Sequence, residues 1–548
     1  MKRFDFDVKT QDIFNRYFSF NFGGTWKNWL EISTKDEFID LCLNNSGLIE
    51  IDQILEKIIS TKTGSREFAL NLKEFLGEYD FKKPPVLCHT SGTTNNNPSA
   101  LKWFHMSEEI IKKLWVPGMQ AIFESSGLSF KSSAIIFVPS RMNFDGIKYY
   151  EDNKYISLYS SEFSQRLVLS QIKPKSYLLY PYKDVFNLEV LSYIFMLDDI
   201  SVISAPAATI LKWADIERLK SGIKNYIAKT KKEKKINLEN LDIMQMIEKE
   251  GLDIGVRKIQ EQLSKTISDA VLIFSISSLN EEKWDLIRNF MKWNRGGERF
   301  TNLYVASEIG PFASSLPFRE FKTSRENKMY VFPLTLPALE YRGSIKLITE
   351  TEANKGRLLV SRMHNSQPLI NIDTDDVITV LGQNSLPVIG GDILRGEFKL
   401  KYQIKINNKI NKPANPVISA GNFMIFDEFE VKDSQSLFNC INRQLQLKND
   451  SLLLIKSQKN NSKWSLIIPT NKETSVFERD VNKVIFNCPN ENKFKNAIRH
   501  HIIDVKDFNE KLIDFFEPKE NVLQKVRQGI YPKGILKRWP LYVVRSEK

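Results

Sequence analysis

Hydrophobic and polar positions follow two different periods along the chain. Residues 1 to about 80 carry apolar side chains at helical spacing, which predicts a mainly helical segment. From about 85 to 210, short apolar runs at 86–88, 134–138 and 200–203 alternate with segments of helical period. Runs of this length between polar loops are typical of buried strands. We therefore predict a largely parallel sheet with helices on its faces and with ligand sites at the carboxyl ends of its strands.

The pattern continues with helices first and strands later. Residues 107–125 are predicted to form one helix, with Ser107 as its N-cap and Pro117 as a kink. A long charged helical segment runs from 207 to about 268, and the apolar run 270–274 is the next buried strand. After residue 330 the pattern is rich in strands. The predicted fold class is α/β, with a large N-terminal domain of mostly parallel sheets flanked by helices.

Composition indicates an ordered globular protein. The 548 residues exceed one average domain, and 42% apolar with 11% aromatic residues can fill large cores. The start of the chain is charged at once, so we expect no signal peptide. The most apolar stretch, 191–205, is interrupted by two aspartates, so we expect no membrane span. Four cysteines without a CxxC pair or metal spacing predict a reduced, cytoplasmic protein.

The formal charge of +12 raises the hypothesis of nucleic-acid binding. The lysines are dispersed, however, and the one dense run, 229–235, fits a solvated linker or helix face. No zinc-finger or RNA-binding signature accompanies it. We therefore expect no direct nucleic-acid function, because a basic surface also suits an enzyme that handles ATP, CoA or an acidic carrier protein.

The first candidate for chemistry is the turn Thr90–Thr94, which follows an apolar run. Gly92 lets the main chain approach a ligand closely. Ser91, Thr93 and Thr94 supply hydroxyl donors, and main-chain N–H groups of such a turn can point at an anion. On composition alone these residues also fit a plain polar loop.

Two further motifs follow in order. Tyr304–Glu308 combines an aromatic ring, a hydroxyl and a carboxylate, and Pro368–Asp376 ends in an acidic cluster preceded upstream by the apolar stretch Gly356–Val360. A carboxylate such as Asp376 has two acceptor oxygens and suits a pair of vicinal hydroxyls. Taken alone, Glu308 fits a surface carboxylate, and the aspartates fit an acidic turn.

Together these motifs resemble those of the adenylate-forming superfamily, which includes acyl-CoA and aryl-CoA ligases, peptide-synthetase adenylation domains and luciferases. The superfamily's phosphate loop has the pattern Thr-Ser-Gly-(Ser/Thr)-Thr-Gly-x-Pro-Lys, and its first five positions match Thr90–Thr94. Asn95 replaces the second glycine and Ser99 stands in place of the lysine. These departures resemble the branch of phenylacetate-CoA ligases and acyl-protein synthetases.

The resemblance implies a role for each motif. The turn Thr90–Thr94 would hold the ATP phosphates, Tyr304 would lie near the adenine, Ser307 would meet the α-phosphate, Glu308 would bind Mg²⁺ and Asp376 would accept hydrogen bonds from the ribose hydroxyls. The implied catalytic residues are Lys533, Lys537, Thr93 and Glu308. Both lysines compete for the family's C-terminal lysine, because the Gly-Lys order at 533–534 is inverted.

The resemblance also implies a domain division. Residues 1–394 would form the adenylation domain and 395–548 a small, mobile α+β C-terminal domain. Arg395, in the segment 392–396, is the candidate hinge residue that contacts ribose or phosphate.

The implied reaction is ATP-dependent activation of a carboxylic acid as an acyl- or aryl-adenylate, with release of pyrophosphate and transfer to a thiol. The chain would be an AMP-forming carboxylate ligase of the acid–thiol type. Its acceptor would be CoA or the phosphopantetheine of an acyl carrier protein. The alternatives are an amine, a cysteine of a partner acyltransferase or reductase, internal acceptors at Cys440 and Cys488, or a non-catalytic relative that binds nucleotide or a partner only.

Overall fold

The chain folds into two compact units, one built mainly from residues before 394 and the other mainly from 394–548, with 375–377 grouped with the second. The computed structural model describes residues 2–5, 56–57, 62, 71, 74–75, 78, 86–89, 103–111, 115–138, 156–157, 160–233, 241–275, 281–295, 297–306, 308–315, 329–332, 335–341, 343–347, 355–362, 369–381, 388–395, 398–401, 416–421, 423–445, 447, 452–456, 463–468, 477–507 and 540–546.

A sheet of 13 strands forms the framework of the larger unit. The first six strands in spatial order, β1 to β9, are parallel neighbours, and antiparallel pairing begins between β9 and β10. In spatial order the strands are β1 (Lys2–Asp5), β6 (Ser176–Pro181), β4 (Ser133–Val138), β7 (Ile200–Ser204), β8 (Val271–Ser275), β9 (Phe300–Ala306), β10 (Gly310–Ser314), β11 (Met329–Val331), β16 (Val388–Arg395), β15 (Leu369–Leu381), β14 (Lys355–Arg362), β12 (Thr335–Tyr341) and β13 (Ser344–Leu347).

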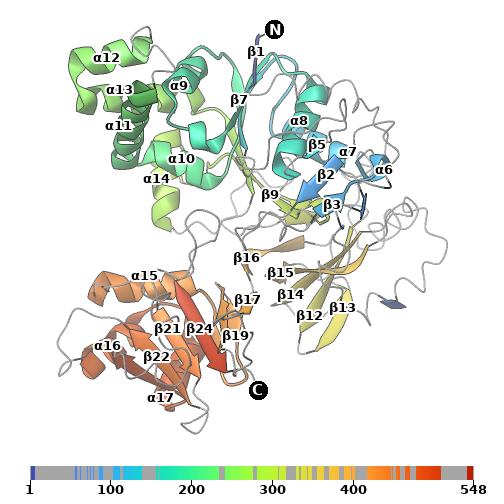
Figure 1. Cartoon of the computed structure of the whole chain (residues 1–548), viewed down its shortest axis with the longest axis vertical. Coiled ribbons are helices and arrows are strands. Elements are labelled where there is room, and N and C mark those ends of the chain that lie inside the picture. Colours follow the sequence, from blue (N-terminus) through green and yellow to red (C-terminus); the bar gives the residue numbers. More distant parts are fainter. Residues whose placement is uncertain are drawn as a thin grey trace. The chain divides into compact units, whose positions relative to one another are not determined.

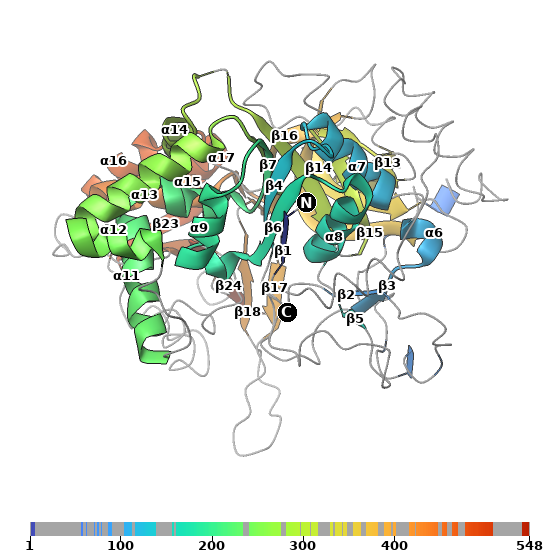
Figure 2. The same ribbon diagram turned by 90° about the horizontal axis from the view of Figure 1, so that it is seen from above.

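Helices cover both faces of the parallel strands, which confirms the predicted α/β class. Figures 1 and 2 show α9 to α14 on one side of these strands and α7 with α8 on the other. Strand β4 shows why, because Ile135 and Phe137 join the core on one face while Ile136 and Val138 join the core on the other. Each such side chain contributes about 1.5–3 kcal/mol when fully buried. A strand apolar on both faces is stable only between two layers of helices.

The helices of this unit agree with the hydrophobic pattern. The charged segment after β7 forms four of them, and Asn187 caps α9 by accepting a hydrogen bond from the Glu189 N–H at 2.9 Å. Their bounds are α6 (Glu108–Ile110), α7 (Val116–Ser125), α8 (Ser160–Ile172), α9 (Leu188–Phe195), α10 (Ala207–Ala214), α11 (Ile216–Glu233), α12 (Asp242–Glu250), α13 (Leu252–Ile267) and α14 (Glu281–Met291), with a short 3₁₀ turn at Tyr182–Asp184.

The described parts of the predicted helix at 107–125 are helical, with π-helical residues at Ile111 and Trp115 between α6 and α7. Ser107 is the expected cap, since its Oγ accepts a hydrogen bond from the Ile110 N–H at 3.3 Å. Pro117 lies near the start of α7, but Trp115 before it already has helical angles, with φ −67° and ψ −51°. The expected kink at Pro117 therefore stays a prediction.

Two other expectations for the first ninety residues are corrected. Residues 2–5 form strand β1, which pairs in parallel with β6, although a mainly helical segment was predicted there. The apolar run after residue 85 is a strand, β2 (Val86–His89), but it belongs to a separate three-stranded sheet with β3 (Trp103–His105) and β5 (Ile156–Ser157). Sequence period identifies a strand but does not assign it to a sheet.

The smaller unit has its own sheet and core. Its six strands, in spatial order, are β17 (Phe398–Lys401), β18 (Pro416–Ala420), β24 (Leu541–Ser546), β21 (Leu452–Lys456), β22 (Trp464–Ile468) and β23 (Ile503–Asp507). A hairpin of β19 (Met424–Ile425) and β20 (Glu430–Val431) and the helices α15 (Ser434–Leu445), α16 (Phe477–Asn487) and α17 (Asn492–Arg499) complete it. Apolar residues of β21 to β24, of the hairpin and of the three helices share one core.

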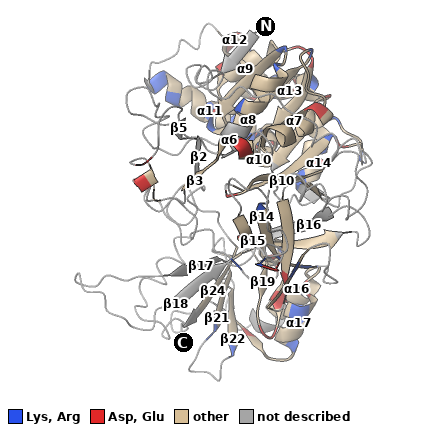
Figure 3. Cartoon of the chain, turned by 90° about the vertical axis from the view of Figure 1, so that its right-hand side faces the viewer, with Lys and Arg blue, Asp and Glu red and all other residues tan. Residues whose placement is uncertain are grey.

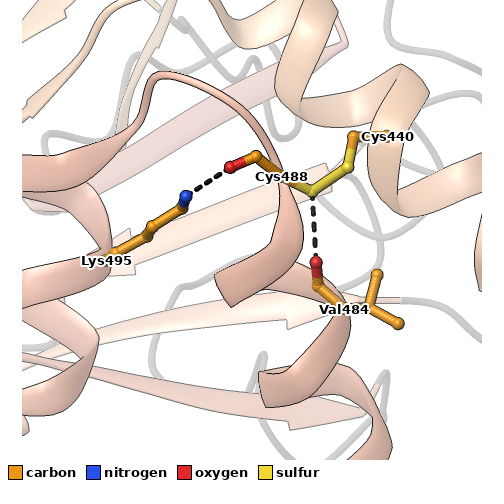
Figure 4. The surroundings of a disulfide bond; sticks show 4 residues. All are labelled: Cys440, Val484, Cys488 and Lys495. Carbon is orange, nitrogen blue, oxygen red and sulfur yellow. Dashed lines mark hydrogen bonds between the residues drawn. A yellow bond between two sulfur atoms is a disulfide. The ribbon is translucent and has the colours of Figure 1, made fainter.

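A disulfide joins two helical segments of this unit. Cys440 lies in α15, and Cys488 directly follows α16, where its Sγ lies 3.3 Å from the carbonyl oxygen of Val484 (Figure 4). Lys495 donates to the Cys488 carbonyl oxygen from the start of α17. The expectation of free thiols at these positions is therefore wrong, and so is the hypothesis that either acts as an acyl acceptor, because a sulfur held in a disulfide is not a nucleophilic thiolate. Cysteine usage no longer argues for the cytoplasm.

None of the helices that the structure describes is long and apolar enough to cross a membrane.

Replacing both Cys440 and Cys488 with serine should lower the free energy of unfolding of the smaller unit by about 2–4 kcal/mol, because the disulfide closes a long loop. The measurement is urea unfolding of the full chain, followed by hydrogen exchange in peptides from that unit's core. Dithiothreitol should lower the stability of the natural protein and leave the double variant unchanged. Equal stability of the two proteins under oxidising conditions would contradict a structural role for the disulfide.

Candidate active site

The carboxyl ends of the parallel strands define one edge of the large sheet. Strands β4, β7, β8 and β9 run in the same direction, so their last residues meet at this edge. The pairing of β8 with β9 ends at Ser275 and Leu303, and β9 continues for three more residues. Ligands of open α/β sheets bind outside this edge. Tyr304 and Glu308 therefore lie where the fold favours a site.

The aromatic residue of this motif is built into the core. Tyr304 is 7% exposed, and its ring centroid lies 4.2 Å from that of Phe312 in β10. Most of its surface is thus covered by protein, and its role beside adenine stays a prediction. Glu308, in contrast, is partly exposed in the turn between β9 and β10.

Asn302 is a residue of this site that the sequence analysis missed. It lies two positions before Tyr304 and is 1% exposed, and neither its side-chain oxygen nor its side-chain nitrogen has a hydrogen-bond partner in the part of the chain that the structure describes. Its main chain is satisfied, because Ser315 Oγ accepts from its N–H at 2.7 Å and Ser314 Oγ donates to its carbonyl at 2.9 Å. A buried amide without partners costs about 1–3 kcal/mol for each polar group. The signal in the sequence was an asparagine within an otherwise apolar strand.

The turn Thr90–Thr94 lies outside the described residues, but the strands on either side of it are described. Strands β2 and β3 are antiparallel, and His89 is paired with Trp103. The candidate phosphate loop is therefore part of the connection of a hairpin. Burial lowers the pKa of His105, in β3, to about 4, and its ring centroid lies 4.9 Å from that of Phe75.

The acidic cluster lies within strand β15, so the interpretation of an acidic turn is wrong. Asp376 is 9% exposed. Asp373 is held by a bidentate ion pair, with Arg357 Nε at 2.7 Å from Oδ1 and NH2 at 2.7 Å from Oδ2, and Lys62 Nζ lies 3.3 Å from Oδ2. These contacts engage both carboxylate oxygens of Asp373, and the role of Asp376 toward the ribose stays a prediction.

The remaining predicted site residues are placed only in part. Arg395 is the last residue of β16. Ser307, Lys533 and Lys537 lie outside the described residues. The stretch Gly356–Val360 lies in strand β14, where a Cβ on Gly356 would lie 2.7 Å from the Glu340 carbonyl oxygen.

The residues of the site suit a magnesium ion that arrives bound to a substrate, rather than one held by protein side chains alone. Within the described part of the chain, no group of three His, Cys, Asp or Glu side chains could hold a metal. Mg²⁺ prefers oxygen ligands and usually takes one or two carboxylates together with substrate phosphates and water. The single, partly exposed carboxylate of Glu308 suits that arrangement.

Comparisons with known proteins give distant structural similarities only. No protein-family model and no curated protein sequence matches the chain. A 2-hydroxyisobutyryl-CoA ligase in complex with 2-HIB-AMP and CoA aligns with a TM-score of 0.46 and 7% identity, over 83% of this chain and 79% of the other.

Two further structures align at lower scores. ATP-bound MatB from Rhodopseudomonas palustris aligns with a TM-score of 0.40 and 9% identity, over 81% and 68% of the two chains. The amide bond synthetase McbA from Marinactinospora thermotolerans aligns with a TM-score of 0.37 and 10% identity, over 78% and 66%. Scores below 0.5 do not establish a shared fold, so the assignment of function depends on the residues of this chain.

The lowered pKa of His105 predicts that acid destabilises the protein. The folded state keeps this imidazole neutral down to about pH 4, whereas the unfolded chain binds a proton below about pH 6.5. His105 should therefore cost about 2 kcal/mol of folding free energy as the pH falls from 7 to 5. Urea unfolding at both pH values checks this.

His105→Gln should remove that part of the pH dependence, and His500→Gln, at an exposed position, serves as the control. A pH profile of His105→Gln identical to that of the natural protein would contradict the assignment.

Proposed function

We propose that the chain is an adenylate-forming enzyme, an AMP-forming carboxylate ligase. A carboxylate attacks the α-phosphate of ATP, an acyl-adenylate forms, and pyrophosphate leaves. The observation that carries the proposal is the end of strand β9, where the buried, unpartnered amide of Asn302 precedes Tyr304 and Glu308 at the binding edge of the sheet. The order of the motifs from Thr90 to Asp376 supports the same conclusion.

Asn302 has the chemistry to bind adenine. A side-chain amide presents a donor and an acceptor side by side, and adenine presents the complementary acceptor and donor along one edge. Pairing would satisfy both of the polar groups that are buried without partners in Asn302.

The other residues would hold the triphosphate and the sugar. We propose that Thr90–Thr94 cradle the phosphates, that Ser307 meets the α-phosphate, and that Asp376 accepts from the ribose hydroxyls. Mg²⁺, held by Glu308 and the phosphates, would neutralise charge on the departing pyrophosphate. Catalysis would then come mainly from positioning and electrostatics, with Lys533 or Lys537 placing the substrate carboxylate and Arg395 acting near the hinge.

The acyl acceptor in this proposal is a thiol, from CoA or from the phosphopantetheine of a carrier protein. A rotation of the C-terminal domain, 395–548, would admit it to the acyl-adenylate. The departures at Asn95 and Ser99 favour the branch of phenylacetate-CoA ligases and acyl-protein synthetases. The alternative acceptor is an amine or, as in acyl-protein synthetases, a cysteine of a partner acyltransferase or reductase. A cytoplasmic location is proposed separately.

The basic charge supports a small anionic substrate better than a nucleic acid. In Figure 3 the described Lys and Arg residues are spread over elements of both units and interspersed with acidic residues. Such a distribution of charge would attract ATP, CoA or an acidic partner.

Exchange of labelled pyrophosphate into ATP, with a panel of aliphatic and aromatic acids, tests the function. We expect exchange that requires both the matching acid and Mg²⁺, because pyrophosphate release is reversible only through an acyl-adenylate. An unrelated ATP-binding protein controls for background exchange. Measurable ATP binding without exchange for any acid would favour the non-catalytic relative.

Replacing Asn302 with leucine should weaken ATP binding about 10–100-fold, because a matched bidentate pair with adenine is worth about 1–3 kcal/mol. The preference for ATP over GTP should fall in parallel, and the free energy of unfolding without ligand should not decrease, since the unpartnered amide is removed. Isothermal titration calorimetry with both nucleotides measures this.

Asn482→Leu is the matched control, because Asn482 also has a buried side-chain oxygen without a partner but lies in α16 of the smaller unit. Unchanged ATP affinity and unchanged nucleotide preference in Asn302→Leu would refute the adenine assignment.

A further inference from the structure

The turn that carries Glu308 is held from three directions. Its own main chain closes it, with the Ile309 N–H donating to the Ala306 carbonyl at 3.2 Å. Trp115, far away in the sequence, donates from Nε1 to the Ile309 carbonyl at 3.4 Å. Arg362, in β14, lies with NH1 3.5 Å from the Glu308 carbonyl oxygen. Two consecutive carbonyl groups of the turn are thus contacted by side chains from distant elements.

Gly310 shows that the indole of Trp115 is fitted closely against this turn. Its φ of +94° is rarely adopted by residues with a side chain, and a Cβ there would lie 1.7 Å from Trp115 Nε1. Trp115 is itself fully buried, and so is Ile309. The turn therefore has no room to shift on this side, and Glu308 is its partly exposed residue.

Arg362 adds a buried positive charge on the other side. The residue is 3% exposed, and NH1 also lies 3.7 Å from Sδ of Met106. Burying a guanidinium costs desolvation energy, and an apolar side chain of similar volume often serves stability as well or better. A buried cation in contact with the Glu308 turn favours anionic groups near that turn.

We propose that Trp115 and Arg362 are positioning residues that form a clamp on the Glu308 turn and fix its carboxylate for the Mg²⁺ ion of Mg·ATP. The inference deepens the proposed function and rests on it. Neither residue belongs to the motifs that indicated the site, and both act through the main chain of Glu308 and Ile309.

The test measures the effect of Mg²⁺ on ATP binding by calorimetry, with and without the ion, in the natural protein, Arg362→Met, Arg362→Lys and Trp115→Phe. Arg362→Met should weaken the Mg²⁺-dependent part of binding about tenfold, as is usual for residues that orient metal ligands. Trp115→Phe keeps an aromatic side chain but removes the indole N–H and part of the buried ring, and we expect about a fivefold loss from the missing hydrogen bond. ATP affinity without Mg²⁺ should change less than about twofold. A general loss of structure would instead weaken binding equally with and without Mg²⁺.

Arg362→Lys should restore part of the Mg²⁺ effect, because it keeps the charge, and it remains informative if Arg362→Met does not fold. Arg357→Met is the control on the same strand, since Arg357 pairs with Asp373 and should leave the Mg²⁺ effect unchanged. Thermal unfolding of each variant reports its stability separately.

The outcomes separate the clamp from the function. An unchanged Mg²⁺ effect in both Arg362→Met and Trp115→Phe, or equal losses with and without Mg²⁺, overturns the clamp. A natural protein that binds Mg·ATP but exchanges no pyrophosphate with any acid overturns the proposed function, while the binding data still decide the clamp. A natural protein whose ATP binding does not respond to Mg²⁺ overturns both.

Discussion

Parallel pairing of strands buried on both faces is the constraint on which the rest of the larger unit depends. Because β4 contributes side chains to two cores, helices must cover both sides of the sheet, and each connection returns to the same edge. Parallel pairing alone therefore brings the carboxyl ends of β4, β7, β8 and β9 to one edge, and no particular side chain is needed for this. The sheet provides the position of the site, and a few residues at the end of β9 provide its chemistry.

The end of β9 combines rigidity with unsatisfied polarity. Tyr304 and Ile309 are anchored in the core, and the turn between them presents Glu308. Asn302 retains a buried amide without partners, which is unusual in a folded protein and marks a place where a ligand or water is expected. Residues that lower stability locally are often found at functional sites. Three such residues occur in this small region: Asn302 has a buried amide without partners, Gly310 has a positive φ, and Arg362 is a buried cation.

The sequence predicted those features of the fold that depend on local pattern. The run 134–138 and the Ser107 cap were correct because apolar burial and capping are decided by neighbouring residues. The Cys440–Cys488 pair and the contact of Trp115 with Ile309 join residues far apart in the chain. The periodic pattern of apolar residues does not predict contacts between such distant positions. Asn302 was visible, but only burial shows that its amide lacks partners.

The unpartnered amide of Asn302 has a consequence for how the protein folds. A ligand that pairs with it binds the native state and finds no equivalent pair of groups in the unfolded chain, so binding and folding are linked by mass action. The ligand-free chain is then a less stable molecule than its cores alone would make it. The abundance of the folded protein in a cell would follow the concentration of that ligand, because the ligand supplies hydrogen bonds that the protein interior lacks.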